Sequence, residues 1–186
     1  MKRFIVFILL TVFGQYVYGQ DSLVVMFWNV ENFFDHVDQG TGESDKEFSS
    51  FGARHWTKRK FQTKCDDIAK SVLWTGDEYG RKPDVIGLAE VENRWDLWKL
   101  LNNTLLRKYD YKIVHFDSGD RRGIDVALLY RESFFSMLSY SLTVPVAGGE
   151  RMSTRDMLQV CLEDLMGQKI NMIVCHHPSK YGGAEE

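Results

Sequence analysis

Cysteine is scarce in this chain of 186 residues, which contains only Cys65, Cys161 and Cys175. Three thiols cannot all pair, and their wide spacing is unlike that of a zinc knuckle, which argues against a cysteine-based metal site. Two interpretations stay open. The thiols are unpaired and buried, or Cys161 and Cys175, in two neighbouring predicted strands, form a disulfide. Neither interpretation gives them a role in chemistry.

An excess of positive charge is also missing. The formal net charge is −3, which gives no reason to expect a strongly basic surface for non-specific nucleic-acid binding. Internal repeats, low-complexity tracts and linkers are absent after residue 19. With 44% hydrophobic and 13% aromatic residues, the composition is that of a folded protein and not of a disordered one. We expect one domain over residues 20–186.

Long apolar runs are absent except at the N-terminus. Lys2 and Arg3 precede an apolar run over residues 4–13, and residues 14–20 are more polar. This order is typical of a secretory signal peptide. A membrane helix is the alternative, but it needs ~20 apolar residues. We therefore expect a signal peptide over residues 1–19 and a secreted or periplasmic chain without stable membrane insertion. The absence of a cysteine after the run does not support a lipid anchor.

Hydrophobic periodicity predicts alternating strands and helices in the first part of the chain. Residues 23–29 and 84–90 are short apolar runs of the kind found in buried strands. Thr57 is a candidate cap for a helix that ends at Gly76, and Asn93 is a candidate cap for a second helix. The apolar residues expected on the inner faces of these helices are Phe61, Cys65, Ile68, Ala69, Val72 and Leu73, then Leu97, Trp98, Leu101 and Leu105.

The second part of the chain is mostly strands. We expect strands at residues 111–116, 124–130, 137–144, 158–163 and 169–175, with a hairpin turn at 165–168. Because helices come early and hairpin-linked strands come late, the pattern favours an α/β layered sandwich with a mixed sheet over a doubly wound parallel fold. Residues 35–55 are polar and contain glycine, which predicts a long exposed loop.

Polar side chains occur where the predicted strands end. Glu90 follows an apolar strand, and a carboxylate at a sheet edge suits Mg²⁺, although the same residue could cap the next helix. Asn29 ends another apolar strand, where a buried amide without partners would cost roughly 1–3 kcal/mol. It therefore needs partners, either in a turn or at a catalytic carboxylate and a phosphate. Glu31 could add a metal contact, whereas Asn32 is expected to close the turn.

Further candidates lie in the second part of the chain. His176 ends a strand, where a histidine is often only a surface residue. Ser179 and the glycines that follow it in the sequence could surround a phosphate. Arg155 could clamp phosphate oxygens or pair with Asp156. Asp125 enters the core with a charge and needs a partner, for which His176 would serve.

Together these residues form a pattern. The sequence resembles the endonuclease/exonuclease/phosphatase family, which includes pancreatic-type deoxyribonucleases, abasic-site endonucleases, bacterial sphingomyelinases and inositol polyphosphate phosphatases. The resemblance covers Leu23 to Gly183 and rests on motifs in the family's order. They are Trp-Asn-Val-Glu-Asn at 28–32, Gly-Leu-Ala-Glu-Val-Glu-Asn at 87–93, Gly-Ile-Asp-Val-Ala-Leu-Leu-Tyr-Arg at 123–131, Thr-Arg-Asp at 154–156 and Cys-His-His-Pro-Ser-Lys at 175–180.

The resemblance implies a role for most of the candidates. Asn29 would orient a catalytic group at the phosphate, and Glu90 would bind Mg²⁺, with Mn²⁺ or Ca²⁺ as alternatives. Glu31 stands where some members place an accessory acid near the metal. Arg155 and His176 would contact the scissile phosphate. The implied fold is a four-layer α/β sandwich of the deoxyribonuclease I-like type, of which this chain would supply the first half, a mixed sheet with flanking helices.

The chain departs from the family's pattern in places. Ala89 stands where a Gln is common and His177 where an aromatic residue is common. Family members also carry a Gly-Asp-Phe-Asn-like and a Ser-Asp-His-like motif downstream of residue 186. We therefore expect the chain as given to be an incomplete domain, inactive and prone to aggregation through an uncovered apolar sheet face.

For the intact protein we expect a metal-dependent, monomeric phosphoesterase whose leading substrate is nucleic acid. A phospholipid such as sphingomyelin, or an inositol or sugar phosphate, is the alternative substrate. A non-catalytic phosphate- or partner-binding protein on the same scaffold is the alternative from another functional class.

Overall fold

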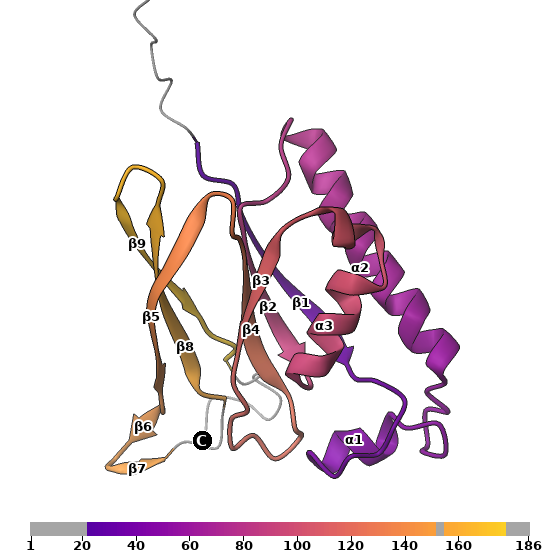
Figure 1. Ribbon diagram of the computed structural model, residues 1–186. Coiled ribbons are helices and arrows are strands. Elements are labelled where there is room, and N and C mark those ends of the chain that lie inside the picture. Colours follow the sequence, from indigo (N-terminus) through magenta and orange to yellow (C-terminus); the bar gives the residue numbers. More distant parts are fainter. Residues whose placement is uncertain (1–21, 152–154, 178–186) are drawn as a thin grey trace, which may run out of the picture.

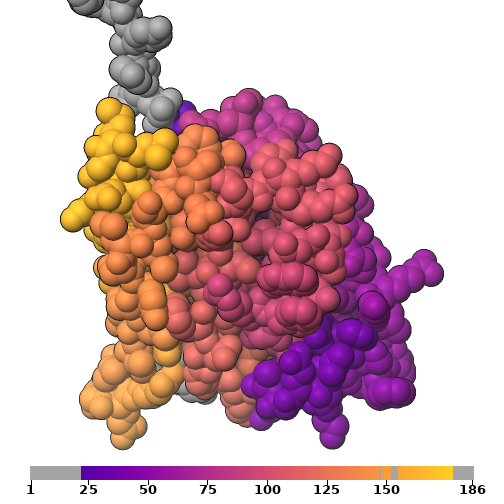
Figure 2. Space-filling model, viewed as in Figure 1, coloured from indigo at the N-terminus to yellow at the C-terminus, as the bar shows by residue number. Residues whose placement is uncertain are grey.

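Three layers are visible in the computed structural model, which describes residues 22–151 and 155–177 (Figure 1). Helices α2 (Lys58–Glu78) and α3 (Arg94–Asn102) form the first layer. A four-stranded sheet forms the middle layer, and a three-stranded sheet forms the opposite side of the molecule, as the orange and yellow surface in Figure 2 shows. The predicted signal peptide, residues 1–19, lies outside the described residues. Within the described part, no helix is long and apolar enough to span a membrane.

The four-stranded sheet is mixed, as the sequence predicts. Its order is β1-β2-β4-β3, formed by β1 (Val25–Phe33), β2 (Val85–Val91), β4 (Asp125–Arg131) and β3 (Tyr111–His115). β1 and β2 are parallel, and the other two pairs are antiparallel. Because β2 and β4 are covered on both sides, almost all of their residues are buried, which explains their continuous apolar sequences.

The two helices use the predicted caps. The Thr57 side chain accepts a hydrogen bond from the Lys60 amide, and the Asn93 side chain accepts one from the Asp96 amide at 3.0 Å. The predicted end of α2 at Gly76 is wrong. The helix continues to Glu78, because Gly76 packs against Lys82 inside the fold, and Gly80, with φ 73°, follows the C-terminus instead.

The predicted inner faces of the helices are correct except at the end of α3. The α2 residues Phe61, Cys65, Ile68, Ala69 and Val72 are buried against the sheet, and Leu73 packs beside them. Leu97 and Leu101 of α3 are buried, but Trp98 is largely exposed. Leu105 is not part of α3. It is exposed at the start of the 3-10 helix η1 (Leu105–Lys108).

The second sheet corrects the expectation that this chain supplies only one. Its order is β5-β8-β9, formed by β5 (Phe135–Thr143), β8 (Met157–Asp164) and β9 (Lys169–Val174), all antiparallel. The predicted turn at 165–168 joins β8 to β9, and the Asp164 amide donates to the Gln168 carbonyl. A short hairpin of β6 (Val146–Ala147) and β7 (Glu150–Arg151) extends β5 and was not predicted.

Apolar side chains from the two sheets meet in a second core. Its members are Val85, Ala89, Val114, Val126, Leu128, Tyr130, Phe135, Leu158, Val160, Leu162 and Val174. β8 and β9 contact β4 and β2, but β1 lies beyond them. On β1, Val25 is 47% exposed and Phe27 is 57% exposed. One strand of the inner face is therefore uncovered.

The three cysteines are free, so the disulfide between Cys161 and Cys175 is not formed. Cys65 is buried in the core between the helices and the sheet, and burial raises the pKa of its thiol to about 12.

The prediction that residues 35–55 form a long exposed loop is only partly correct. Helix α1 (Glu43–Glu47) lies within residues 35–55, and Asp35 and Asp45 are buried.

Four buried carboxylates lie where this loop meets α3, namely Asp35, Asp45, Glu92 and Asp96. Glu92 accepts hydrogen bonds from the Asp35 amide at 3.1 Å and the Thr41 hydroxyl at 3.0 Å. Asp96 is fully buried, and neither of its oxygens has a donor among the described residues when it is ionised. Burial, and then the neighbouring carboxylates, raise the pKa values of Glu92 and Asp96. A proton held by one of these two carboxyls would supply the missing donor.

Candidate active site

A bulge in the pairing of β1 with β2 creates the site. Asn29 pairs with Ala89, and regular pairing resumes only at Phe33 and Val91. Within the bulge, Glu31, Asn32 and Glu90 have φ values of 56°, 58° and 64°, in the left-handed region that favours glycine. Backbone strain of this kind is common at functional sites. Its effect here is that Glu90 leaves the regular pairing of the sheet.

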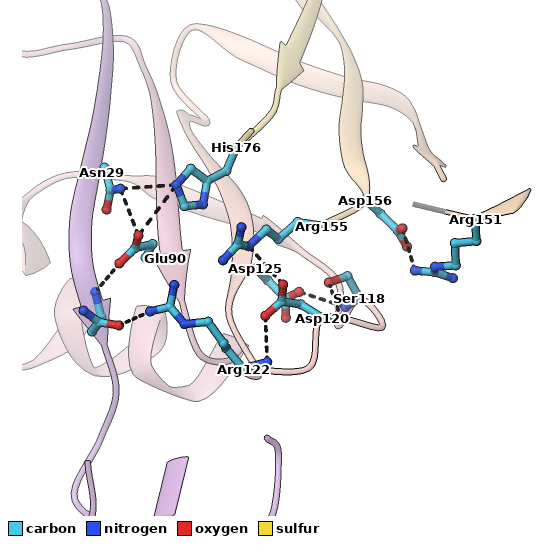
Figure 3. A network of polar contacts seen from close by, with 11 residues as sticks. Asn29, Glu90, Ser118, Asp120, Arg122, Asp125, Arg151, Arg155, Asp156 and His176 are labelled. Carbon is cyan, nitrogen blue, oxygen red and sulfur yellow. Dashed lines mark hydrogen bonds and ion pairs between the residues drawn. The ribbon is translucent and has the colours of Figure 1, made fainter. Parts of the chain in front are cut away.

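Glu90 is the centre of a polar cluster that joins both sheets (Figure 3). The Asn29 amide Nδ2 donates to Glu90 Oε1 at 3.1 Å, and the Asn32 backbone amide donates to Oε2 at 2.9 Å. His176, which follows β9, places Nε2 3.6 Å from Glu90 Oε1 and 3.4 Å from Asn29 Nδ2. The structure therefore brings together Asn29, Glu90 and His176, three residues that the sequence singled out.

The surroundings favour an ionised Glu90. Burial alone would raise its pKa, but the hydrogen bonds from Asn29 and Asn32 and the charges of Arg122 and His176 lower the pKa below its ordinary value. Burial, and then the charge of Arg155, lower the pKa of His176. Near neutral pH the site therefore combines a carboxylate with a neutral imidazole.

Two arginines and an aspartate extend the cluster, and the sequence reasoning missed part of this arrangement. Arg155 is buried and forms an ion pair with Asp120, with 3.1 Å between Nε and Oδ2. Asp120 Oδ1 also accepts from the Arg122 amide at 2.9 Å, and the Arg122 guanidinium donates to Asn32 Oδ1 at 2.5 Å. Asp120 and Arg122 lie in the charged loop over residues 117–123, which the sequence analysis treated only as a connection between two strands.

The sequence predicted that Asp125 pairs with His176, and this prediction is wrong. The Asp125 carboxylate lies 3.6 Å from Nε2 of His115, and it accepts a hydrogen bond from the Ser118 amide at 2.9 Å. The reason is that the two residues lie at different places in the fold. Asp125 begins β4 next to the end of β3, whereas His176 follows β9 and meets the β1–β2 bulge.

The other candidates are placed as follows. Arg155 is paired with Asp120, while Asp156 pairs with Arg151 at 2.8 Å, so the expected alternative of an Arg155–Asp156 pair is not formed. Glu31 is exposed, its amide donates to Asn29 Oδ1, and its carbonyl accepts from Lys64. Ser179 lies outside the described residues.

A pocket of about 840 Å³ opens beside the cluster, between the end of β1 and the first turns of α2. Asn29 and Glu31 line both the pocket and the site. Trp28 and Trp56 add two aromatic rings, and the remaining polar lining residues are Thr57, Arg59, Lys60, Thr63, Lys64 and Asp67. The Lys64 ammonium lies 5.8 Å from the centre of the Trp56 ring, and burial lowers the pKa of Lys64.

Solved structures with a similar fold are known. The catalytic domain of human nocturnin matches 86% of this chain with a TM-score of 0.55 and 16% identity, and 52% of that chain is covered. A mannosyl-6-phosphatase from Bacteroides thetaiotaomicron matches 82% of this chain with a TM-score of 0.51 and 18% identity, and 50% of that chain is covered. This chain therefore spans about half the length of the structures that it resembles. No curated protein sequence matches it.

The assignment of the chain to a family follows from a match over almost its whole described sequence. Residues 24–186 match the model of the endonuclease/exonuclease/phosphatase family. The matched segment contains the β1–β2 bulge, both sheets and each of the clustered side chains. The mixed α/β architecture agrees with that of the similar solved structures. The chain therefore belongs to the endonuclease/exonuclease/phosphatase family.

Proposed function

We propose that the protein is a metal-dependent phosphoesterase that hydrolyses phosphodiester bonds in nucleic acid. One observation carries the first part of the proposal. A partly buried carboxylate on a strained bulge of β2, Glu90, is contacted by the Asn29 amide from β1 and by the His176 imidazole that follows β9. Members of this family act on phosphoester bonds with divalent metals. Because the chain spans about half the length of similar structures, the activity proposed is that of the whole protein.

The residues present fit a hard divalent cation such as Mg²⁺, with Glu90 as its main ligand. Each Glu90 oxygen accepts one hydrogen bond from the protein, which leaves lone pairs for a cation. The Glu31 carboxylate is exposed at the same bulge and could contribute, directly or through water. An all-oxygen donor set suits Mg²⁺. When bound, the cation would withdraw negative charge from the phosphate oxygens.

The protein's own side chains would orient the phosphate and neutralise its charge. The Asn29 amide donates to Glu90, and its nitrogen also lies 3.4 Å from His176 Nε2, so Asn29 positions both the carboxylate and the imidazole. His176, neutral near pH 7, can donate one hydrogen bond to a phosphate oxygen. Arg122 and Arg155 add positive charge nearby, and their pairing with Asn32 and Asp120 keeps both guanidiniums in place. Donors that are already oriented stabilise developing charge without reorganisation.

The pocket beside the site supports nucleic acid as the substrate. Two tryptophan rings offer surfaces on which bases stack, and Arg59, Lys60 and Lys64 can neutralise backbone phosphates. A base adjacent to the scissile phosphate would enter the pocket past Asn29 and Glu31, which line both spaces. A phosphate monoester of a sugar has no base for these rings.

A substrate panel tests the proposal. The whole protein is offered plasmid DNA, single-stranded RNA, sphingomyelin and a sugar phosphate, each with Mg²⁺ and again with excess chelator. We expect metal-dependent cleavage of a nucleic acid and little turnover of the other substrates. Exclusive turnover of sphingomyelin or of the sugar phosphate would move the substrate to that class. Turnover that persists in chelator would refute the metal dependence, and inactivity on all four would favour a binding protein.

A further inference from the structure

A second group of metal-binding side chains lies on a different part of the fold. His115 ends β3, Asp125 begins β4, and Asp117 lies in the connection between these strands. One ligand atom from each residue lies within 4.8 Å of the others. None of the three contacts Glu90 among the interactions of the described residues. This group is therefore separate from the candidate active site.

The geometry of the buried pair is that of two ligands and not of a hydrogen bond. His115 Nε2 and Asp125 Oδ2 are 3.6 Å apart, beyond the roughly 2.7–3.2 Å of a hydrogen bond. His115 Nε2 is buried and has no hydrogen-bond partner among the described residues. Two ligand atoms at about 2.1 Å from a tetrahedral ion lie roughly 3.4 Å apart, close to the observed spacing. The unsatisfied nitrogen is thus directed at a position that a cation can occupy.

The charges agree with this interpretation. The His115 side chain is 1% exposed and lies between two carboxylates, with Asp117 Oδ1 3.9 Å from Nδ1 and Asp125 Oδ2 3.6 Å from Nε2. Asp120 is a third carboxylate close to Asp125, so the place is rich in acidic side chains. The Arg94 guanidinium, which donates to the Ile113 carbonyl, lies near His115 and its charge opposes a cation there.

We infer that His115, Asp117 and Asp125 form a second metal site, for a divalent transition ion of the Zn²⁺ type. One imidazole and two carboxylates suit such an ion, whereas Mg²⁺ and Ca²⁺ prefer oxygen ligands alone. Asp117 Oδ1 lies 3.9 Å from the other ring nitrogen, Nδ1. Because Asp117 is 86% exposed, its carboxylate can turn towards an ion at Nε2, and a water would complete a tetrahedral set.

The position of the site suggests what the ion would do. Asp125 also accepts from the Ser118 amide, and the Ser118 hydroxyl accepts from the Asp120 amide at 3.3 Å (Figure 3). Asp120 is the partner of Arg155. An ion bound to Asp117 and Asp125 would therefore fix both ends of the loop that positions Arg155.

The inference is tested by binding and not by hydrolysis. The full chain is freed of metal, supplied with excess Mg²⁺ to fill an oxygen-ligand site, and titrated calorimetrically with Zn²⁺. In parallel, Co²⁺ is added and the intensity of its visible absorption reports a tetrahedral environment. We expect one tight Zn²⁺ site in the wild-type chain and in the Glu90→Gln variant. Asp117→Ala and His115→Asn should each weaken it at least ~10-fold.

Controls distinguish this site from other combinations of ligands. Because Asp117 is exposed, Asp117→Ala gives a folded protein even if the buried His115→Asn variant does not. His177→Ala removes the exposed imidazole near Cys175, where Nε2 and Sγ are 3.8 Å apart, and should leave the affinity unchanged. Unchanged Zn²⁺ affinity in Asp117→Ala, or a loss seen only in Glu90→Gln or His177→Ala, would overturn the inference.

Discussion

Asn29 and Glu90 are separated by 61 positions in the sequence, yet the amide of one donates to the carboxylate of the other at 3.1 Å. The contact exists because β1 and β2 are parallel and their regular pairing is interrupted just after Asn29 and Ala89, so Glu90 enters the bulge beside Asn29. A parallel pair therefore brings together side chains that lie far apart along the chain.

This contact predicts how Asn29 controls Glu90. In the whole protein, Asn29→Ala should lower turnover by roughly 10²–10³, the usual effect of losing one oriented donor. Because Asn29 lowers the pKa of Glu90, its removal should raise that pKa and move the acid limb of the pH–rate profile to higher pH. Asn171→Ala, on the exposed side of β9, is the matched control. An unchanged acid limb would contradict the assigned role.

The buried ion pair predicts an effect on stability. Arg155→Ala leaves the Asp120 carboxylate buried without its partner, which should lower the free energy of unfolding by about 3–5 kcal/mol. The control is Lys70→Ala, which removes an exposed pair with Asp67 and should change stability by less than ~1 kcal/mol. Urea denaturation at pH 7 measures both variants. Equal effects would show that Asp120 is solvated.

The pocket predicts a role for Trp56 in binding. Trp56→Ala should weaken the affinity for a short single-stranded DNA by ~5- to 150-fold, because a stacked base contributes about 1–3 kcal/mol. Trp56→Phe keeps a stacking surface and should bind nearly as well as the wild type. Trp98→Ala removes an exposed ring on α3, away from the pocket, and should have no effect. Fluorescence anisotropy measures the affinities, and equal losses in the Trp56 and Trp98 variants would argue against the pocket.

The Glu92–Asp96 pair predicts a pH dependence of stability. Both carboxyls have raised pKa values in the folded protein, so their contribution is complete below their ordinary pKa of about 4 and is lost as the pH rises. Asp96→Asn removes one charge and gives Glu92 an N–H donor. The variant should gain stability relative to the wild type as the pH increases from 5 to 8, by an amount on the order of 1–3 kcal/mol.

Denaturation curves of both proteins at several pH values measure this difference. The comparison between variant and wild type removes the effect of other groups, such as His115, that titrate in the same range. A difference in stability that is constant with pH would mean that Asp96 is not neutral in the folded protein.

The uncovered face of β1 predicts self-association of the chain. Phe27→Ser should lower the light scattering of a concentrated solution, because it removes an exposed ring from an apolar strand at a sheet edge. Trp74→Ser removes a ring that is also exposed, on α2, and should change the scattering much less. Equal reductions in the two variants would show that association does not occur through β1.

The sequence predicted the parts of the fold that depend on local patterns. The caps Thr57 and Asn93 and the turn at 165–168 were correct because each depends on neighbouring residues. The end of α2 was missed because Gly76 is tolerated inside a helix that packs against Lys82. The strands of the second sheet were found, but their assembly into a separate sheet was not, because long-range pairing leaves no local signal.

The candidate active site was likewise predictable only where local sequence patterns were enough. Asn29, Glu90 and His176 were identifiable as polar residues at the ends of apolar strands, and the structure places them together. The partner of Asp125 was wrong because periodicity does not show which strand ends are neighbours. Asp120 and Arg122 were missed because a charged loop between strands has the composition of an ordinary solvated turn.

The strained conformation of Glu90 has a consequence for how this protein can change. A left-handed φ costs a residue such as glutamate roughly 1–2 kcal/mol, whereas asparagine adopts it more readily but has no carboxylate. Variants chosen for thermal resistance alone would therefore accumulate Glu90→Asn and lose the carboxylate. Thermal stability and metal binding therefore favour different residues at position 90. Selection for stability alone would remove the active-site carboxylate while the fold is kept.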